Sequence, residues 1–288
     1  MRFRAQHRVG GMTAALPYDA AVLLLLPPSE GKTAPRRGKP LDLDTLLEAP
    51  ALTAPRRALM EELGGLGTGP DAVRVLGLGP RSGQDAAVNQ SLATAPAAPA
   101  HALFTGVLYE AAALHDLARR TAARRVLGEE VVILSGLWGV LRATDAVPDH
   151  RLSMGVTLPA AGRLAAFWRP RLAPVLGGIA GTSGVVVDCR SGAYSPAWQP
   201  SASDGLALAR VKVVQRSEDG SLTTVSHWAK HARGLLAGAI VDRRARAPRS
   251  LRSLEDVAEL TAGLDAVGAV ELGPADRVGR RDLVLHLA

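Results

Sequence analysis

The sequence predicts a mixed α/β fold in which strands and helices alternate along the chain and one antiparallel hairpin interrupts the alternation. The 288 residues are 47% hydrophobic, which is enough apolar material to bury a large core. Short apolar runs of strand length recur between stretches with helical length and spacing. The turn Glu218-Asp219-Gly220 separates two of these runs and is typical of a hairpin.

Short apolar runs predict the strands, and most of these runs are followed by small or polar residues. In chain order the expected strands cover residues 22–26, 131–134, 185–187, 211–214, 222–225 and 282–287. The fourth and fifth runs pair across the acidic turn, so the sheet is not expected to be purely parallel. The last run is expected to return to the sheet as a closing strand.

Stretches with helical length and spacing predict the helices. In chain order they cover residues 103–125, 160–176, 227–241 and 250–264. Pro170 and Pro174 should kink or break the second helix, because a proline inside a helix removes a hydrogen bond and clashes with the preceding turn. Ser253 is the expected N-cap of the last helix.

The chain is predicted to form one α/β domain, residues 20–288, after a disordered extension, residues 1–19. Met12 is an alternative to Met1 as the start. The parts of the domain are a helical hairpin part at about 41–92, a main body at about 101–242 and a C-terminal tail at 243–288. The Ala- and Pro-rich segment 93–100 is the expected connection between the first two parts.

Charge and cysteine content limit the classes of function. The formal charge is +7 and the pI about 10.3, which favours phosphate-bearing partners, although a bias toward Ala, Arg and Gly explains it equally well. The single cysteine, Cys189, excludes an internal disulfide framework and is expected to be a small buried residue rather than a redox sensor.

The apolar run 21–26 is too short for a secretory signal, and no run is long enough to span a bilayer. We therefore expect a cytoplasmic protein without a membrane partner.

Three histidines, His101, His115 and His227, stand apart from any cysteine or carboxylate cluster with metal-ligand spacing. The sequence therefore predicts no dedicated metal site and no cofactor.

The first expected strand ends in Pro-Pro-Ser-Glu-Gly-Lys-Thr, which places Ser29, Lys32 and Thr33 at the mouth of the sheet. This segment is not a P-loop, because Leu26 stands where that motif needs a glycine. Ligands of open α/β folds bind at the ends of strands. These three residues are therefore candidate anion ligands, with a solvated loop lysine as the alternative interpretation.

The most distinctive run is Ile-Leu-Ser-Gly-Leu-Trp-Gly-Val-Leu-Arg, which contains the second expected strand. Its two glycines, three residues apart, permit close backbone approach, and Ser135 with Gly136 could bind an anion there. Arg142 and the later Arg151 could clamp a phosphate in bidentate fashion, or could instead pair with acidic neighbours. A Gly-x-Ser-x-Gly elbow is absent, so acyl transfer has little support.

Basic residues also begin the helix that follows the hairpin. Lys230 and Arg233 are three residues apart and share a helix face. They could contact one phosphate together, and a solvated basic face is the alternative.

Taken in order, these segments resemble the YaaA family of peroxide-stress proteins. Residues 134–142 followed by 150–155 are similar to that family's Leu-Ser-Gly-aromatic-Gly-Val-Leu-Arg run and its later Arg-Leu-x-Met-Gly run. Four further segments agree in order: Pro28-Ser29 with Lys32-Thr33, Thr105-Gly106 with Tyr109, Phe167-Trp168, and the run from Ala229 to Gly234. The resemblance covers about residues 22–242.

One departure lies after the third expected strand. The family's form has an acidic residue just before a tyrosine, and this chain has Ala193 before Tyr194. Tyr194 stays a candidate ligand, while no carboxylate role is carried over to that position.

The resemblance implies a positively charged cleft, a helix-hairpin-helix element, DNA binding and a role in limiting oxidative damage linked to intracellular iron. With no metal site expected, an effect on iron would be indirect. The helix-hairpin-helix-like element would lie near residues 70–92, where Gly77 and Gly79 follow an apolar-Gly-apolar-Gly pattern. Their backbone N–H groups would bind a DNA phosphate, and Arg74 and Arg81 would add attraction. An ordinary glycine-rich turn is the alternative.

Two functions from different classes stay open. The leading hypothesis is a non-enzymatic DNA-binding protein of the peroxide-stress response, which contacts backbone phosphates in a basic cleft. The alternative is an enzyme acting on a nucleotide or nucleobase-like small molecule, with Lys32, Tyr109 or Lys230 as catalytic candidates. A structural protein with solvated basic groups is a third hypothesis. A deep, closed pocket would favour catalysis, and an open groove wide enough for a duplex would favour DNA binding.

Overall fold

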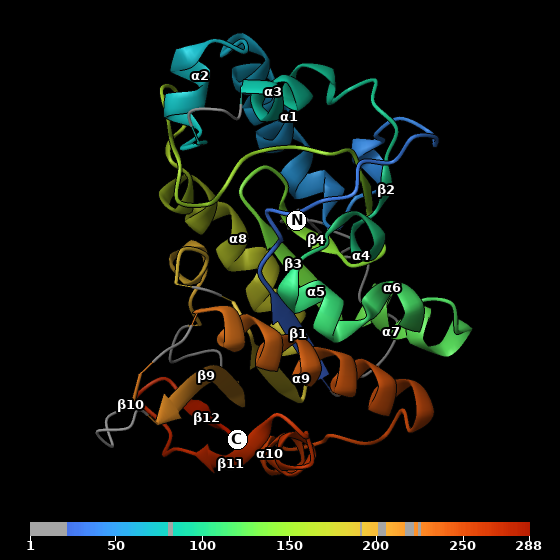
Figure 1. Ribbon diagram of the computed structural model, residues 1–288, viewed down its shortest axis with the longest axis vertical. Helices are drawn as coiled ribbons and strands as arrows, with labels where there is room; N and C mark the ends of the chain where they lie inside the picture. Colours follow the sequence, from blue (N-terminus) through green and yellow to red (C-terminus); the bar gives the residue numbers. More distant parts are fainter. Residues whose placement is uncertain (1–21, 80–82, 191, 201–205, 217–221, 224–225) are drawn as a thin grey trace, which may run out of the picture.

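Figure 1 shows the computed structural model of the chain, which describes residues 22–79, 83–190, 192–200, 206–216, 222–223 and 226–288. Its centre is a sheet with the strand order β11-β12-β9-β8-β1-β3-β4, and β10 also pairs with β9. The strands of this sheet are β1 (Val22–Leu26), β3 (Val131–Ser135), β4 (Gly139–Arg142), β8 (Val185–Asp188), β9 (Leu208–Arg216), β10 (Leu222–Thr223), β11 (Val267–Leu272) and β12 (Arg280–Leu287). Two small pairs lie outside it: β2 (Ala98–Pro99) with β5 (Ala146–Val147), and β6 (Thr157–Leu158) with β7 (Gly162–Arg163).

The inner strands β12, β9, β8, β1 and β3 run parallel, while β4 and β11 are antiparallel edge strands. The predicted mixed α/β fold is therefore confirmed, including the antiparallel hairpin of β9 and β10. Every residue of β1 is buried, as a strand covered on both faces requires and as its unbroken apolar run indicated. Buried side chains from both ends of the described chain belong to one continuous core.

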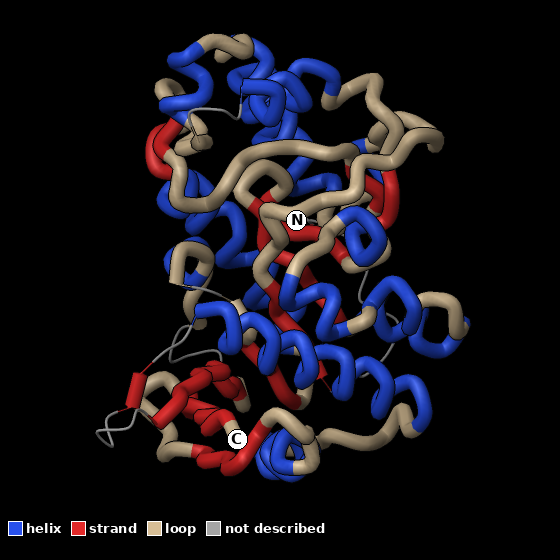
Figure 2. Tube along the Cα trace, in the orientation of Figure 1, coloured by secondary structure: helices blue, strands red, loops and turns tan. Residues whose placement is uncertain are grey.

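Helices surround the sheet (Figure 2). They are α1 (Ala49–Gly65), α2 (Pro70–Val75), α3 (Gly83–Ala87), α4 (Ala100–Leu103), α5 (Val107–Ala112), α6 (Leu114–Leu117), α7 (Thr121–Glu129), α8 (Leu164–Gly181), α9 (Ser226–Arg246) and α10 (Leu254–Ala262). Short 3₁₀ turns are η1 (Leu43–Thr45), η2 (Val88–Ser91) and η3 (Ser195–Ala197). Figure 1 shows α1, α2 and α3 gathered at one end of the molecule, and β9 to β12 with α10 at the other.

Two helix predictions need correction. The single helix expected over 103–125 is divided into α5, α6 and the start of α7. The break between α5 and α6 is at Ala113, whose backbone is left-handed with φ of 49°. The expected break at Pro170 and Pro174 is wrong, because α8 runs through both prolines. Its buried face, which includes Trp168 and Leu172, holds both halves of the helix against the core, and this packing outweighs the hydrogen bonds that the prolines remove.

The C-terminal tail is more regular than the sequence predicted. Ser253 is the expected N-cap of α10, and Asp256 completes a reciprocal capping box with it. The closing strand is confirmed as β12, while β11 was not predicted because Gly268 and Glu271 interrupt its apolar residues and half of the strand is exposed at the sheet edge. The extension 1–19, Arg81 and the turn residues 218–220 lie outside the described residues.

Helices α5 and α9 pack with their backbones close together, and two glycines of α9 permit this. A Cβ atom at Gly234 would lie 2.3 Å from the carbonyl oxygen of Leu108, and one at Gly238 would lie 2.6 Å from that of Ala112. Both distances are far below van der Waals contact with a rigid helix backbone. Gly234, the last residue of the Ala229 to Gly234 segment, is therefore needed for the packing of α9 against α5. This packing determines where Lys230 and Arg233 of α9 lie.

We predict that Gly234→Ala lowers the free energy of unfolding by about 1–3 kcal/mol, because the methyl group must push α9 away from α5. Gly178→Ala is the matched control, since Gly178 lies in α8 with open space around its Cβ position. The control should be unchanged or more stable by up to about 1 kcal/mol, because alanine favours helix. Urea denaturation followed by circular dichroism measures both, and equal stability of the two variants would contradict the packing argument.

Candidate functional site

The candidate site lies at the carboxyl ends of β1 and β8, where the sheet has a topological switch point. The chain leaves β1 toward β3 on one side and leaves β8 toward β9 on the other. In open α/β sheets such a point leaves a crevice outside the strand ends, where ligands bind. Two cavities occupy this crevice, and both are lined by the segment that follows β1.

The first cavity, which we call the hairpin cavity, has a volume of about 370 Å³. It lies between the segment after β1, the hairpin Leu76–Gly79 and the segment around His150. Its lining residues are Pro28, Ser29, Glu30, Lys32, Leu76, Gly77, Leu78, Gly79, Asp85, His150, Arg151, Leu152, Ser153 and Tyr194.

The second cavity, the α9 cavity, has a volume of about 490 Å³. It lies between the ends of β1 and β8 and the starts of α5 and α9. Its lining residues are Pro27, Pro28, Ser29, Glu30, Gly31, Gly106, Val107, Leu108, Tyr109, Ser153, Cys189, Ala193, Tyr194, Ala229, Lys230 and Arg233. Ser29, Glu30, Ser153 and Tyr194 line both cavities, so the two form one continuous site.

Lys32 is a cation of the hairpin cavity that forms no ion pair with a carboxylate of the described residues. Its Nζ lies 3.4 Å from the carbonyl oxygen of Glu30 and 5.6 Å from the centre of the Phe104 ring. Burial, and secondarily the charge of Arg151, lower the pKa of Lys32 to about 8. Near that pH about half of the amine is neutral, which an ordinary surface lysine is not.

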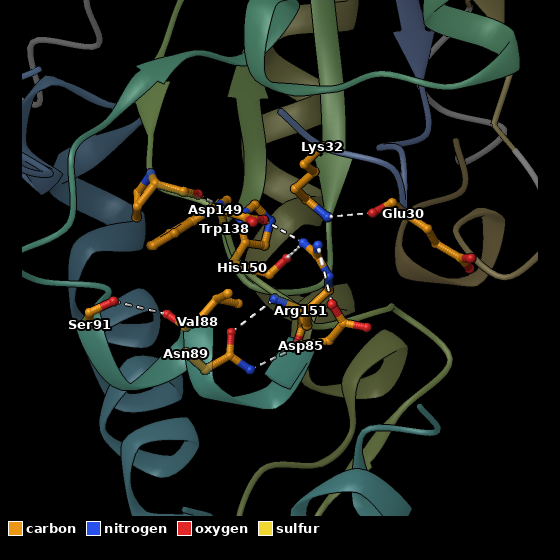
Figure 3. A network of polar contacts seen from close by, with 11 residues as sticks. Glu30, Lys32, Asp85, Val88, Asn89, Ser91, Trp138, Asp149, His150 and Arg151 are labelled. Atoms are coloured by element: carbon orange, nitrogen blue, oxygen red, sulfur yellow. Dashed lines mark hydrogen bonds and ion pairs between the residues drawn. The ribbon is translucent and has the colours of Figure 1, made fainter. Parts of the chain in front are cut away.

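Arg151 stands in the same wall but is held by a network of polar contacts (Figure 3). Its guanidinium pairs with Asp149 and lies 3.8 Å from Asp85. The side-chain amide of Asn89 makes two hydrogen bonds with the backbone of Arg151. Its oxygen accepts from the Arg151 N–H at 2.9 Å, and its nitrogen donates to the Arg151 carbonyl oxygen at 2.9 Å. The pairing with acidic neighbours is therefore present, and Arg151 lines the cavity with its charge largely offset.

His150 is a neutral imidazole beneath the same cavity. It is only 2% exposed, and burial together with the charge of Lys32 holds its pKa well below the ordinary value. Its Nδ1 lies 2.9 Å from the carbonyl oxygen of Pro148. The indole N–H of Trp138 donates to the same nitrogen at 3.4 Å. Both of these polar neighbours of the ring therefore lie at Nδ1.

Hydroxyl groups line the wall shared by the two cavities. The Tyr194 hydroxyl is hydrogen-bonded to the side chain of Ser153 and the backbone of Met154, and burial raises its pKa. Ser29 donates to the carbonyl oxygen of Thr105. Tyr109 donates to the carbonyl oxygen of Pro27 at 2.8 Å, and burial raises its pKa well above the ordinary value. Tyr109 thus stays protonated and fixes the end of β1, which weakens its candidacy as a proton-transfer group.

Lys230 and Arg233 bring the basic face of α9 to the second cavity. Lys230 is exposed at the cavity wall. The guanidinium of Arg233 donates to the carbonyl oxygen of Val211 at 3.1 Å, while its buried Nε has no partner among the described residues. Cys189 lies behind them, fully buried, with its pKa raised to about 12 by burial. The thiol is therefore the small buried residue that the sequence predicted.

Other predicted ligands lie away from the cavities. Ser135 is buried and accepts a hydrogen bond from the N–H of Trp138 at 3.2 Å. Arg142 pairs with Asp145 at 3.6 Å and lies opposite Val132, near the start rather than the end of β3. Thr33 is exposed, and its N–H donates to the carbonyl of Leu103.

Gly136 and the hairpin residues have structural surroundings that explain their type. A Cβ at Gly136 would lie 2.5 Å from the carbonyl oxygen of Leu152, so only glycine lets the segment with Ser153 approach β3. Gly77 has φ of 64° and, with Gly79, lines the hairpin cavity. Arg74 is exposed and pairs with Asp71 at 2.8 Å.

Sequence reasoning missed Trp228 and Asn89. Trp228 is 50% exposed at the start of α9, next to Lys230, and it was visible as one of few aromatic residues within a basic segment. Asn89 gives no such signal, because its contact with Arg151 joins positions 62 residues apart.

Within the described residues, no group of three or more His, Cys, Asp or Glu side chains could hold a metal ion. None of the described helices combines the length and the apolar character that crossing a bilayer requires.

Comparison with known proteins gives consistent matches over most of the chain. The family described as "Peroxide stress protein YaaA" matches residues 22–261. A UPF0246 protein of Streptomyces coelicolor is 43% identical over 225 residues, which are 76% of this chain and 83% of that protein. A UPF0246 protein of Corynebacterium efficiens is 36% identical over 243 residues, 84% of this chain and 92% of that protein. One of Corynebacterium glutamicum is 34% identical over 249 residues, 84% and 94% of the two chains.

We predict that the Lys32 amine titrates with a midpoint near pH 8, because burial disfavours its charged form. Reductive methylation with ¹³C-formaldehyde labels the lysines for NMR, and the Lys32→Arg variant identifies the Lys32 signal by its loss. A midpoint near 10.5, the ordinary value for lysine, would contradict the prediction.

Proposed function

Since the chain belongs to the YaaA family of peroxide stress proteins, as its motifs predicted, we propose that it acts in the peroxide-stress response by binding DNA through backbone phosphates. The double cavity at the ends of β1 and β8 would be the centre of this interface. Protection against iron-driven oxidative damage is part of the proposal, and it would be indirect, since we assign no residue of this chain to iron.

The observation that carries the proposal is a set of cations without anionic partners. Lys32, Lys230 and Arg233 line the cavities, and none of them forms an ion pair with a carboxylate of the described residues. Arg233 also keeps a buried Nε unpartnered. Taking a charged group out of water without a partner is costly, so the half-buried Lys32 and Arg233 favour an anion that arrives with the ligand, and the exposed Lys230 adds attraction. A phosphate group supplies such an anion.

The start of α9 adds to this attraction. Ala229 and Lys230 lie in the first turns of α9, which is 21 residues long, and both line the α9 cavity. The N-terminus of a helix carries partial positive charge and favours phosphate. The exposed ring of Trp228 stands beside these residues, where an unpaired base could stack on it.

The hairpin residues extend the proposed interface. Leu76, Gly77, Leu78 and Gly79 line the hairpin cavity opposite Lys32. The N–H groups of Leu76, Gly77 and Leu78 donate within the chain, to the carbonyl oxygens of Ala72, Arg74 and Val73. In the proposal, the N–H of Gly79 contacts a DNA phosphate without reading bases, and the exposed Arg74 adds attraction. Arg81, which was predicted to flank the hairpin, lies outside the described residues.

The size of the cavities suggests how DNA would be engaged. Volumes of about 370 and 490 Å³ fall in the range of small-molecule sites and are far too small for a duplex. We infer that the backbone runs along the rim while a single nucleotide unit enters the site.

The same cavities, which have the size of small-molecule sites, favour a second candidate function, an enzyme that acts on a nucleotide-like small molecule. Here Lys32 would act as a base or hold a phosphate.

We predict that Lys230→Ala/Arg233→Ala raises the Kd for DNA about tenfold, on the order of 1.4 kcal/mol. Losing two phosphate contacts should also lower the slope of log Kd against log salt by about 2. Fluorescence anisotropy with duplex and single-stranded DNA across a salt series measures both quantities.

The matched control is Arg37→Ala/Lys39→Ala, which removes the same charge at exposed residues that line neither cavity. An equal loss of affinity in the control would show that net charge, not the cavity, attracts DNA. Absence of DNA binding by the unmodified protein at low salt would instead favour the small-molecule enzyme, and a screen of nucleotides would follow.

We predict that Arg74→Ala weakens DNA binding and lowers the salt slope by about 1, because Arg74 is next to the hairpin. Arg119→Ala is the control, since both arginines are exposed and each pairs with an aspartate three residues earlier on a helix or turn. If the two variants bind DNA alike, the hairpin does not contact DNA.

A further inference from the structure

We propose that Lys32 is a nucleophilic amine that forms an imine with an aldehyde carried next to a phosphate group. The sugar aldehyde of a base-free nucleotide in DNA has this chemistry, and so does a free sugar phosphate. The choice of DNA as the source rests on the function proposed above, while the amine chemistry rests on the site itself.

The use of lysine in this chain is the first argument. Only four of its 34 Lys and Arg residues are lysines, namely Lys32, Lys39, Lys212 and Lys230. Two of the four, Lys32 and Lys230, line the double cavity. Arginine supplies positive charge almost everywhere else, but it cannot lose its proton at physiological pH. A lysine at a cavity wall of such an arginine-rich chain therefore indicates a position where the chemistry of a primary amine is needed, and not only a positive charge.

The surroundings of Lys32 are the second argument. Its amine approaches an aromatic ring and a backbone carbonyl, and no described carboxylate forms an ion pair with it. The positive Arg151 lies nearby. A buried position beside another cation is the setting in which lysines become nucleophiles, because it stabilises the neutral amine. The lowered pKa of Lys32, about 8, agrees with this setting.

The charged and titratable groups around Lys32 come from the segment after β1, from α3 and from the segment after β5. They are Glu30, Asp85, Asp149, His150 and Arg151. The carboxylates of Asp85 and Asp149 are engaged by Arg151, so they do not hold the Lys32 ammonium in an ion pair. His150 is neutral, because burial and the charge of Lys32 hold its pKa well below the ordinary value, so it adds no charge beside the amine.

The second cavity provides the place for the phosphate. It joins the hairpin cavity through Ser29, Ser153 and Tyr194, and its wall carries Lys230 and Arg233. A ligand with its aldehyde at Lys32 can therefore extend its phosphate toward these two cations.

The step balances without any added oxidant or reductant. The lone pair of the neutral Lys32 amine forms a bond to the aldehyde carbon, and the carbonyl π electrons move to oxygen. One amine proton moves to this oxygen, which gives the carbinolamine. Its hydroxyl then leaves together with the remaining N–H proton as one water molecule, which leaves a carbon–nitrogen double bond. Borohydride reduces this imine to a stable secondary amine, so the adduct can be trapped.

The test is borohydride trapping with the full chain in four parallel samples. They contain duplex DNA with one abasic site, the same duplex intact, glyceraldehyde 3-phosphate, and glyceraldehyde. Mass spectrometry locates the adduct among the four lysines, and anisotropy measures DNA binding by the same preparations. Lys32→Arg keeps the charge and removes the amine, and Lys39→Arg is the control at an exposed lysine outside both cavities.

We expect an adduct on Lys32 with the abasic duplex, reduced about tenfold or more in Lys32→Arg and unchanged in Lys39→Arg. DNA affinity is measured for both variants by anisotropy, and Lys39→Arg should bind DNA like the unmodified chain. The trapping rate should rise with pH up to about 8 as the neutral amine accumulates.

The outcomes separate the inference from the proposed function. DNA binding without any Lys32 adduct overturns the amine chemistry and leaves DNA binding in place. An adduct with glyceraldehyde 3-phosphate, but neither an adduct nor affinity with DNA, supports the amine chemistry and overturns DNA as the source of the aldehyde. Equal labelling with glyceraldehyde and its phosphate, or equal labelling in Lys32→Arg, overturns the inference.

Discussion

The close contact between Gly136 and the backbone of Leu152 is the constraint on which the candidate site depends. A side chain at position 136 would meet the Leu152 carbonyl at 2.5 Å and the Ser153 backbone at 2.9 Å, so only glycine lets this segment lie against the end of β3. The Gly136 carbonyl in turn accepts a hydrogen bond from Trp168 of α8 at 2.8 Å. This one contact therefore ties β3, α8 and the segment that carries His150, Arg151 and Ser153 into the walls of both cavities.

The charged residues of the molecule differ in how their charge is balanced. Among the buried arginines outside the cavities, Arg190 pairs with Asp188 at 2.7 Å and Arg244 pairs with Glu130 at 2.7 Å, while Arg56 donates to three backbone carbonyls and keeps one terminal nitrogen without a partner among the described residues. In the cavities, the half-buried Arg233 has one carbonyl acceptor and an unpartnered Nε, and the half-buried Lys32 has only a long contact to a carbonyl. Compositional bias toward arginine explains many surface cations, but it does not explain two half-buried cations of one strand-end crevice that form no ion pair with a carboxylate of the described residues.

The sequence was informative where the determining contacts are local. The unbroken apolar run of β1 and the Ser253 cap depend on neighbours within a few residues, and the motif segments identified the family. The cavity walls depend on contacts between distant positions, such as Asn89 with Arg151 and Ser29 with Thr105, which no local pattern encodes. Ser135 and Arg142 lie in a family motif, yet neither lines the hairpin cavity or the α9 cavity. A motif indicates that a residue type is needed at a position, but it does not tell whether packing or ligand binding needs it.

Ala193 stands where the resemblance drawn from the sequence led us to expect an acidic residue. Ala193 lines the α9 cavity, where Glu30 is the one carboxylate among the described lining residues and Lys230 and Arg233 are the cations. An acidic side chain there would face the same space and offset part of their charge. With alanine at this position the wall of the α9 cavity keeps more of its positive charge, which agrees with the anion binding proposed above.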